Sequence, residues 1–203
     1  MTTRADAPPR NLRARRRVAL MRRVQAVALD LFEARGLDAV TVEEIAARCE
    51  VSPPTLYRHF GTKEQLVLWD EYDAVVLDGL TRNLRGLPVM EALRRTILDP
   101  LERVYAADAD RILRRARLAD REPALQVARA TAMRAFRSEV AERLLEAGSC
   151  RDRFEADVVA GAFFLALEVA IAHWASAEAA VPLCVFIGRA LDELGALSHP
   201  KRP

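Results

Sequence analysis

Residues 41–61 read TVEEIAARCEVSPPTLYRHFG and contain the most informative pattern of the chain. Thr41 followed three residues later by Glu44 forms a capping box, which predicts a short helix that begins there. Ser52 is a favourable N-cap, and Pro53 suits the first helical position because its missing N–H needs no partner there. A second short helix is therefore expected over about 53–59, joined to the first by a tight turn.

A longer helix precedes the two short ones. Its apolar residues Leu20, Val24 and Leu31 recur at helical spacing and leave one polar face. Gly36 can end this helix as a left-handed residue, so the helix is expected over about 16–35. Three helices in this order form a helix-turn-helix pattern, in which the last helix can enter the major groove of DNA.

The last helix of the pattern has an inner and an outer side. Helical spacing puts Leu56 and Phe60 on the inner side, facing Leu31, Val42 and Ile45. The outer side offers a guanidinium, hydroxyl groups, an imidazole and two prolines, which suit base edges and phosphates. The candidate DNA-reading residues are Pro53, Pro54, Thr55, Tyr57, Arg58 and His59. An ordinary solvated helix face is the alternative.

The net charge of +2 is unevenly distributed along the chain. Residues 1–60 contain eleven Arg against seven Asp or Glu, whereas residues 61–203 have a small negative excess. Eight of these Arg lie within the first 23 residues, so residues 1–17 are interpreted as a basic flexible arm that meets a polyanion. High genomic GC content is an alternative source of the Arg bias itself.

Proline and glycine divide the rest of the chain into helix-sized segments without useful strand alternation. The predicted fold class is all-α with about nine helices: a three-helix helix-turn-helix domain over 18–62, then a larger helical domain over 63–203. The helix after Thr62 is expected to run unbroken over about 63–84. Later helices are expected over about 89–106, 109–119, 123–147, 152–177 and 182–195. Pro100 is expected to bend or split the first of them, and the second is short and basic.

Residues 28–37 and 41–66 together resemble the TetR family of bacterial repressors. The match is dense over ALDLFEARGL, TVEEIA and VSPPTLYRHFGTKEQL. The resemblance implies a homodimer that binds a double-stranded DNA operator, with phosphate contacts from Thr41, Tyr57, His59 and Lys63. Lys63 also lies in the first turn of a helix, where the macrodipole disfavours a cation unless an anion approaches.

The resemblance further implies a small-molecule effector bound within the C-terminal domain. Aromatic and apolar residues at helical spacing are candidate pocket walls, although each also fits a plain hydrophobic core. Glu168 and His173 are the polar exceptions in an apolar stretch, and a mostly apolar ligand is expected. The candidates are Trp69, Tyr72, Tyr105, Met133, Phe136, Phe164, Leu167, Glu168 and His173.

Helices over about 154–177 and 182–195 are the predicted dimer interface. Small residues would let two helices approach closely, and larger apolar residues would fill the seam. The candidates are Gly161, Ala162, Leu165, Val169 and Leu191. The alternative is that these residues bury only the core of one chain.

Several other function classes find no support in the sequence. The three cysteines and three histidines are scattered, so no metal site and no cofactor are expected. No hydrolase or phosphate-loop motif is present, so an enzyme is not expected. In the most apolar stretch, 157–175, the longest uncharged run is 158–167, which is too short to span a bilayer. No signal peptide is visible, so we expect a cytoplasmic protein. A regulator without an effector, or an activator, stays an alternative.

Overall fold

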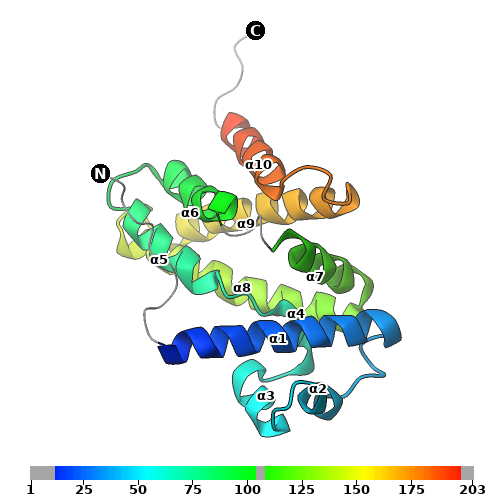
Figure 1. The fold of residues 1–203 in the computed structure, drawn as a ribbon. Helices are drawn as coiled ribbons and strands as arrows, with labels where there is room; N and C mark the ends of the chain where they lie inside the picture. Colours follow the sequence, from blue (N-terminus) through cyan, green and yellow to red (C-terminus); the bar gives the residue numbers. More distant parts are fainter. Residues whose placement is uncertain (1–11, 104–107, 198–203) are drawn as a thin grey trace, which may run out of the picture.

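The computed structural model describes residues 12–103 and 108–197. Over these ranges the chain is all-α, as predicted, and has no strand (Figure 1). Its ten helices are α1 (Leu12–Arg35), α2 (Val42–Arg48), α3 (Pro53–Phe60), α4 (Lys63–Leu68), α5 (Asp73–Asn83), α6 (Val89–Arg103), α7 (Ala109–Arg121), α8 (Pro123–Glu146), α9 (Arg153–Ser176) and α10 (Leu183–Leu197).

Helices α1 to α4 share one hydrophobic core with Leu118 and Ala119 of α7 and Leu125 of α8. We call the part formed by α1 to α4 the reading head. Val24, Ile45 and Leu56 are almost completely buried in it, and the inner residues predicted for α3 lie there. At the end of α1, Gly36 has a positive φ of 81°, and its N–H donates to the carbonyl oxygen of Phe32 at 2.8 Å. This is the left-handed helix end that the sequence predicts.

Helices α6, α8, α9 and α10 build a second core, and we call the part formed by α5 to α10 the body. Trp174, Phe163 and Leu93 are among its most buried side chains. The reading head lies at one end of the molecule, and α9 and α10 lie at the other (Figure 1).

Helix α9 is long and apolar enough to cross a membrane, with a mean hydropathy of 1.8 over its most apolar window. Only 33% of that window is buried within the chain. An exposed apolar face on such a helix therefore has to be explained by a further contact.

Three helix limits differ from the sequence prediction. Helix α1 begins at Leu12, so residues 12–17 of the predicted arm belong to a helix; residues 1–11 lie outside the described residues. Pro100 lies inside α6 without splitting it. The predicted end of the last helix at Gly195 is wrong, because α10 continues to Leu197. A glycine inside a helix costs only about 1 kcal/mol, so packing can override it.

The largest correction concerns the helix predicted over 63–84, which is two helices. Helix α4 ends at Leu68, and Trp69 leaves the helical region with φ −53° and ψ 125°. Asp70 accepts a hydrogen bond from the backbone N–H of Tyr72 at 2.9 Å, a local turn that competes with helix continuation. The chain between reading head and body is thus a bent linker over 69–72.

Candidate nucleic-acid interface and its connection to the body

Helix α3 has the amphipathic division expected of a recognition helix. Leu56 and Phe60 are buried, whereas Tyr57 is 47% exposed. Pro54 and Arg58 are also exposed, and Pro53, Thr55 and His59 are half-buried. The outer side of α3 therefore presents a phenol, a guanidinium and an imidazole, while the apolar residues of the inner side pack on the core. These groups can bind phosphates and base edges.

The turn before α3 is held by a left-handed residue and a hydroxyl pair. Glu50 has a positive φ of 54°. Ser52 has the extended backbone of an N-cap, but its side chain caps no backbone N–H. Its hydroxyl lies 2.9 Å from that of Thr55 instead. The Thr55 hydroxyl thus already has a partner within the protein.

Thr41 performs the capping role that the sequence predicts. Its hydroxyl accepts a hydrogen bond from the backbone N–H of Glu44 at 3.1 Å. The carboxylate of Glu44 pairs with Arg35 at 2.6 Å and with Arg48 at 3.3 Å. Thr41 is exposed at the start of α2. It therefore holds α2 in place and is still accessible from outside the protein.

Lys63 has partners within the protein that the sequence did not predict. Its ammonium group donates to the carbonyl oxygens of Leu37 at 2.8 Å and Val40 at 3.3 Å. The loop between α1 and α2 is thereby tied to the start of α4. These carbonyls offset the unfavourable position of a cation in the first helical turn, so no external anion is needed for that purpose.

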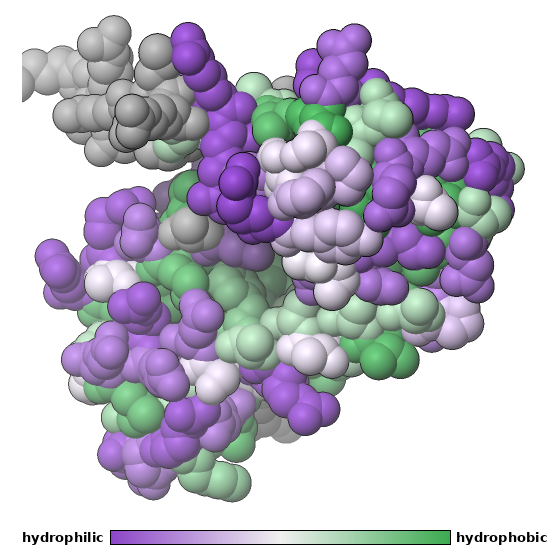
Figure 2. Space-filling model, turned by 90° about the horizontal axis from the view of Figure 1, so that it is seen from below, coloured by the Kyte–Doolittle hydropathy of each residue, from purple (hydrophilic) through white to green (hydrophobic). Residues whose placement is uncertain are grey.

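The positive charge near α3 comes from exposed arginines of α1 and α3. Burial lowers the pKa of His59, and the nearby guanidinium groups of Arg17 and Arg58 lower it further. Arg15 and Arg16 are also exposed near the start of α1. Figure 2, which looks at the molecule from the side of α2 and α3, shows hydrophilic residues over much of this face. This end of the molecule therefore suits a polyanion.

The predicted ligand-binding residues do not form one group. Trp69 packs edge-on against Phe60 of the reading head, with ring centroids 6.0 Å apart. Tyr72 is buried between head and body. Glu168 and His173 are exposed, so neither is a polar residue buried in the core. Tyr105 lies outside the described residues.

Of the remaining four candidates, Met133 and Phe136 lie on α8, and Phe164 and Leu167 lie on α9. The rings of Phe136 and Phe164 meet edge to face with centroids 5.5 Å apart. Phe164 and Leu167 are buried, and Met133 is 39% exposed. Residues 126–135 of α8, which include Met133, are all exposed or half-buried. This part of α8 presents an uncovered face next to an aromatic core.

The predicted dimer residues divide between surface and core. Leu165 and Val169 are 61% and 47% exposed. Gly161 and Ala162 are half-buried, and a side chain added at Gly161 would meet no other atom within 4 Å. Leu191 is buried in the body and is therefore not an exposed contact residue.

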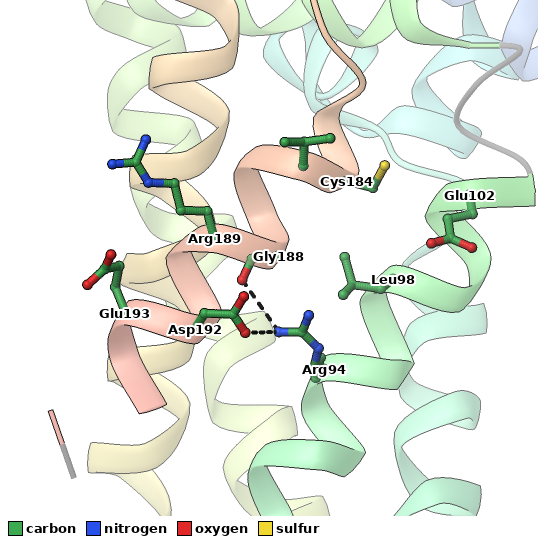
Figure 3. A pocket seen from close by; sticks show the side chains of 9 residues that line it. Arg94, Leu98, Glu102, Cys184, Gly188, Arg189, Asp192 and Glu193 are labelled. Carbon is green, nitrogen blue, oxygen red and sulfur yellow. Dashed lines mark hydrogen bonds and ion pairs between the residues drawn. The ribbon is translucent and has the colours of Figure 1, made fainter. Parts of the chain in front are cut away.

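A separate open groove of about 540 Å³ lies between α6 and α10 (Figure 3). Arg94 donates to the carboxylate of Asp192 at 2.5 Å and to the carbonyl oxygen of Gly188 at 3.4 Å within it. Charged residues of both signs line the groove, and none of the predicted ligand-binding residues does. No sequence pattern predicted this groove.

A short first core, an exposed recognition helix and a separate helical body define the class of a helix-turn-helix transcriptional regulator. Two family models match the chain: the bacterial regulatory proteins of the tetR family at residues 25–68, and the MftR C-terminal domain at residues 87–198. The chain belongs to the TetR family of bacterial transcriptional regulators, which are not enzymes.

Individual relatives agree with this assignment. The HTH-type transcriptional repressor Rv3405c of Mycobacterium tuberculosis is 39% identical over 103 residues, which is 51% of each chain. The alignment thus spans about half the length of that relative. MftR of the same organism is 27% identical over 90% of this chain and 92% of its own. FadR of Thermus thermophilus, solved with lauroyl-CoA, shares the fold with a TM-score of 0.55 and 24% identity, over 90% of this chain and 97% of that one.

Proposed function

We propose that this regulator is a repressor that binds a palindromic operator as a homodimer and is released by a small, mostly apolar effector. The observation that carries the DNA-binding part is the recognition helix: Leu56 and Phe60 seat α3 on the core, while Tyr57 and Arg58 stay exposed. Repression is favoured over activation by the named repressor among the relatives.

The homodimer is supported by the exposed apolar face of α9. Phe154, Val158, Leu165 and Val169 are each at least 47% exposed and recur at helical spacing along one side. Monomeric proteins rarely leave such a contiguous apolar stripe in water. A second copy packed against it would also explain why only a third of this apolar helix is buried within one chain.

The effector is proposed to bind against Met133 and Phe136 of α8, beside Phe164 and Leu167 of α9. The uncovered face of α8 supports this position, since an apolar ligand would cover Met133 and extend the Phe136–Phe164 contact. A fatty acyl ligand in the FadR neighbour supports the apolar character.

The test of the proposal uses DNA duplexes that the full chain selects by binding from a pool of random sequences. We expect inverted repeats whose half-sites are about 10 bp apart, centre to centre, because two recognition helices of a dimer read successive major grooves. A reporter gene placed behind the enriched duplex should be less active when the protein is present. Enrichment of single half-sites would contradict the dimer, and a more active reporter would contradict repression.

A further inference from the structure

Three arginines of α7 connect this helix to the reading head. Arg114 donates to Glu33 of α1 at 2.7 Å and to Asp30 at 2.6 Å. Arg111 donates to the side-chain oxygen of Gln25 in α1 at 2.9 Å. Arg115 binds the end of α4, as described next. We call Arg111, Arg114 and Arg115 the arginine clamp.

Arg115 donates hydrogen bonds to the backbone carbonyls at the end of α4, where the chain leaves the helix. It donates to the carbonyl oxygens of Val67 and Leu68 at 2.9 Å each, and to the carboxylate of Asp70 at 3.2 Å. Gln25, which is completely buried, donates to three carbonyls of the same segment at 2.9–3.1 Å. The last carbonyls of a helix have no intrahelical partner, so these two side chains replace the continuation of α4.

Arg111 lies in a buried ionic network at the linker. Its guanidinium group donates to Glu71 at 3.0 Å and to Asp108 at 2.9 Å, and the side chain of Glu71 is only 5% exposed. The hydroxyl of Tyr72 donates to Asp108 at 2.8 Å, and Arg22 of α1 pairs with Glu71. The network therefore joins α1, the linker and α7.

A buried ionic network of this kind contributes little to the free energy of folding, but it fixes the relative positions of the groups that it joins. The free energy needed to remove the charges from water is about as large as the free energy gained from their attraction. One donor, the Nε–H of Arg111, is moreover buried without a hydrogen-bond partner among the described residues. Guanidinium groups instead impose direction, because their donors form a rigid planar fork. The contacts of all three arginines therefore constrain the angle between α7 and the reading head, together with the apolar packing of Leu118 and Ala119 in the core of the head.

We propose that the arginine clamp positions the reading head on the body, so that Arg111, Arg114 and Arg115 set the separation of the two recognition helices. A continuous helix over 63–84 could set this angle by itself, but the bent linker over 69–72 cannot. The clamp is the polar connection that bypasses the linker and reaches α1 and α4 directly. The proposal rests on the proposed homodimer, because a separation needs two heads.

Operator binding with altered spacing tests the clamp. The duplex enriched by the wild-type chain is remade with the two half-sites moved apart or together by one or two base pairs. For Arg115→Gln we expect about tenfold weaker binding at the best spacing, or about 1.4 kcal/mol. Binding at the other spacings should change little, so that the preference for one spacing flattens.

Two further variants separate positioning from general damage. Arg114→Glu should act like Arg115→Gln, and adding Glu33→Arg should restore the spacing preference by exchanging the two charges. Arg117→Gln is the matched control: Arg117 lies on the same helix but faces Glu178 of the body at 3.9 Å. It should behave like the wild type.

A uniform loss of affinity at all spacings, or an unchanged spacing preference in both clamp variants, would overturn the proposal. If the wild-type chain itself shows no spacing preference, the homodimer proposal fails and the clamp is judged by hydrogen exchange of the free protein. Amides over 69–76 should then exchange faster in Arg115→Gln than in Arg117→Gln, with those of α3 unchanged. Equal exchange over 69–76 would count against the clamp.

Discussion

Tyr57 and Lys63 are both polar residues at the DNA-facing end, but their surroundings differ. Tyr57 is 47% exposed on the outer side of α3. Lys63 is half-buried and has two carbonyl partners. The same kind of substitution should therefore act on DNA binding at one position and on folding at the other.

Tyr57→Phe removes one hydroxyl from the outer side of α3. We expect operator binding to weaken by about 1–2 kcal/mol, the range for a lost hydrogen bond to a charged group. Urea unfolding should have an unchanged midpoint, because the ring keeps its position. A fall in stability that matches the loss of DNA affinity would show that the hydroxyl serves packing instead.

Lys63→Ala removes the donor that ties the loop between α1 and α2 to α4. We expect the free energy of unfolding to fall by about 1–2 kcal/mol, because two carbonyls lose a charged donor at a half-buried position. Lys63→Arg is the control that keeps the charge. Unchanged stability together with weaker, less salt-dependent operator binding would assign Lys63 to a phosphate.

Arg58→Ala tests base reading directly. If the guanidinium binds the edge of a guanine, affinity should fall by about 1–3 kcal/mol, and the preference at one position of each half-site should relax. The measurement is binding to a set of operators that differ at single positions. An equal loss on every operator would place Arg58 on the phosphate backbone.

Helix starts were predictable where the decisive partners are close in sequence. The hydroxyls of Thr41 and Thr62 and the carboxylate of Asp152 each accept from the backbone N–H three residues on, as their sequences indicate. The break after α4 was not predictable in this way. Besides the local turn at Asp70, it depends on Gln25 and Arg115, which are more than 40 residues away from the carbonyls they bind.

The difference between local and distant partners also explains why two candidate ligand-binding residues lie away from the others. Trp69 and Tyr72 lie where a continuous helix would have directed them to a pocket, but the bent linker brings them to Phe60 and Asp108. The division of α3 into inner and outer sides was predictable, because it depends only on helical spacing. The contacts of the arginine clamp were not predicted; the sequence indicated only a short basic helix at this position.

Leu165→Glu tests the role of α9 as a dimer interface. Leu165 is 61% exposed, so the change should leave the fold of one chain intact. In a dimer the new carboxylate would be buried without a partner, which strongly disfavours association. Light scattering should therefore report a monomer at concentrations where the wild type is a dimer. Ser176→Glu, at an exposed polar position near the end of α9, is the control.

The complete regulator should couple its two ligands reciprocally. If an effector bound at α8 and α9 lowers operator affinity by some factor, operator DNA must lower effector affinity by the same factor. Lauroyl-CoA is the first probe, titrated with and without the enriched operator. Two different factors would point to a second effector site, and equal effector affinity in both titrations would leave a DNA-binding regulator without an effector switch.

A variant at the rim of the proposed effector site separates binding from transmission. Met133→Trp adds volume at a side chain that is 39% exposed, so it should block the probe without overpacking the core around Phe164. Operator affinity without probe should stay within about twofold of the wild type, since Met133 is exposed on α8 and does not belong to the hydrophobic core of the reading head. The probe should then no longer release the operator. Release that persists in Met133→Trp would move the effector away from α8 and refute the position proposed for it.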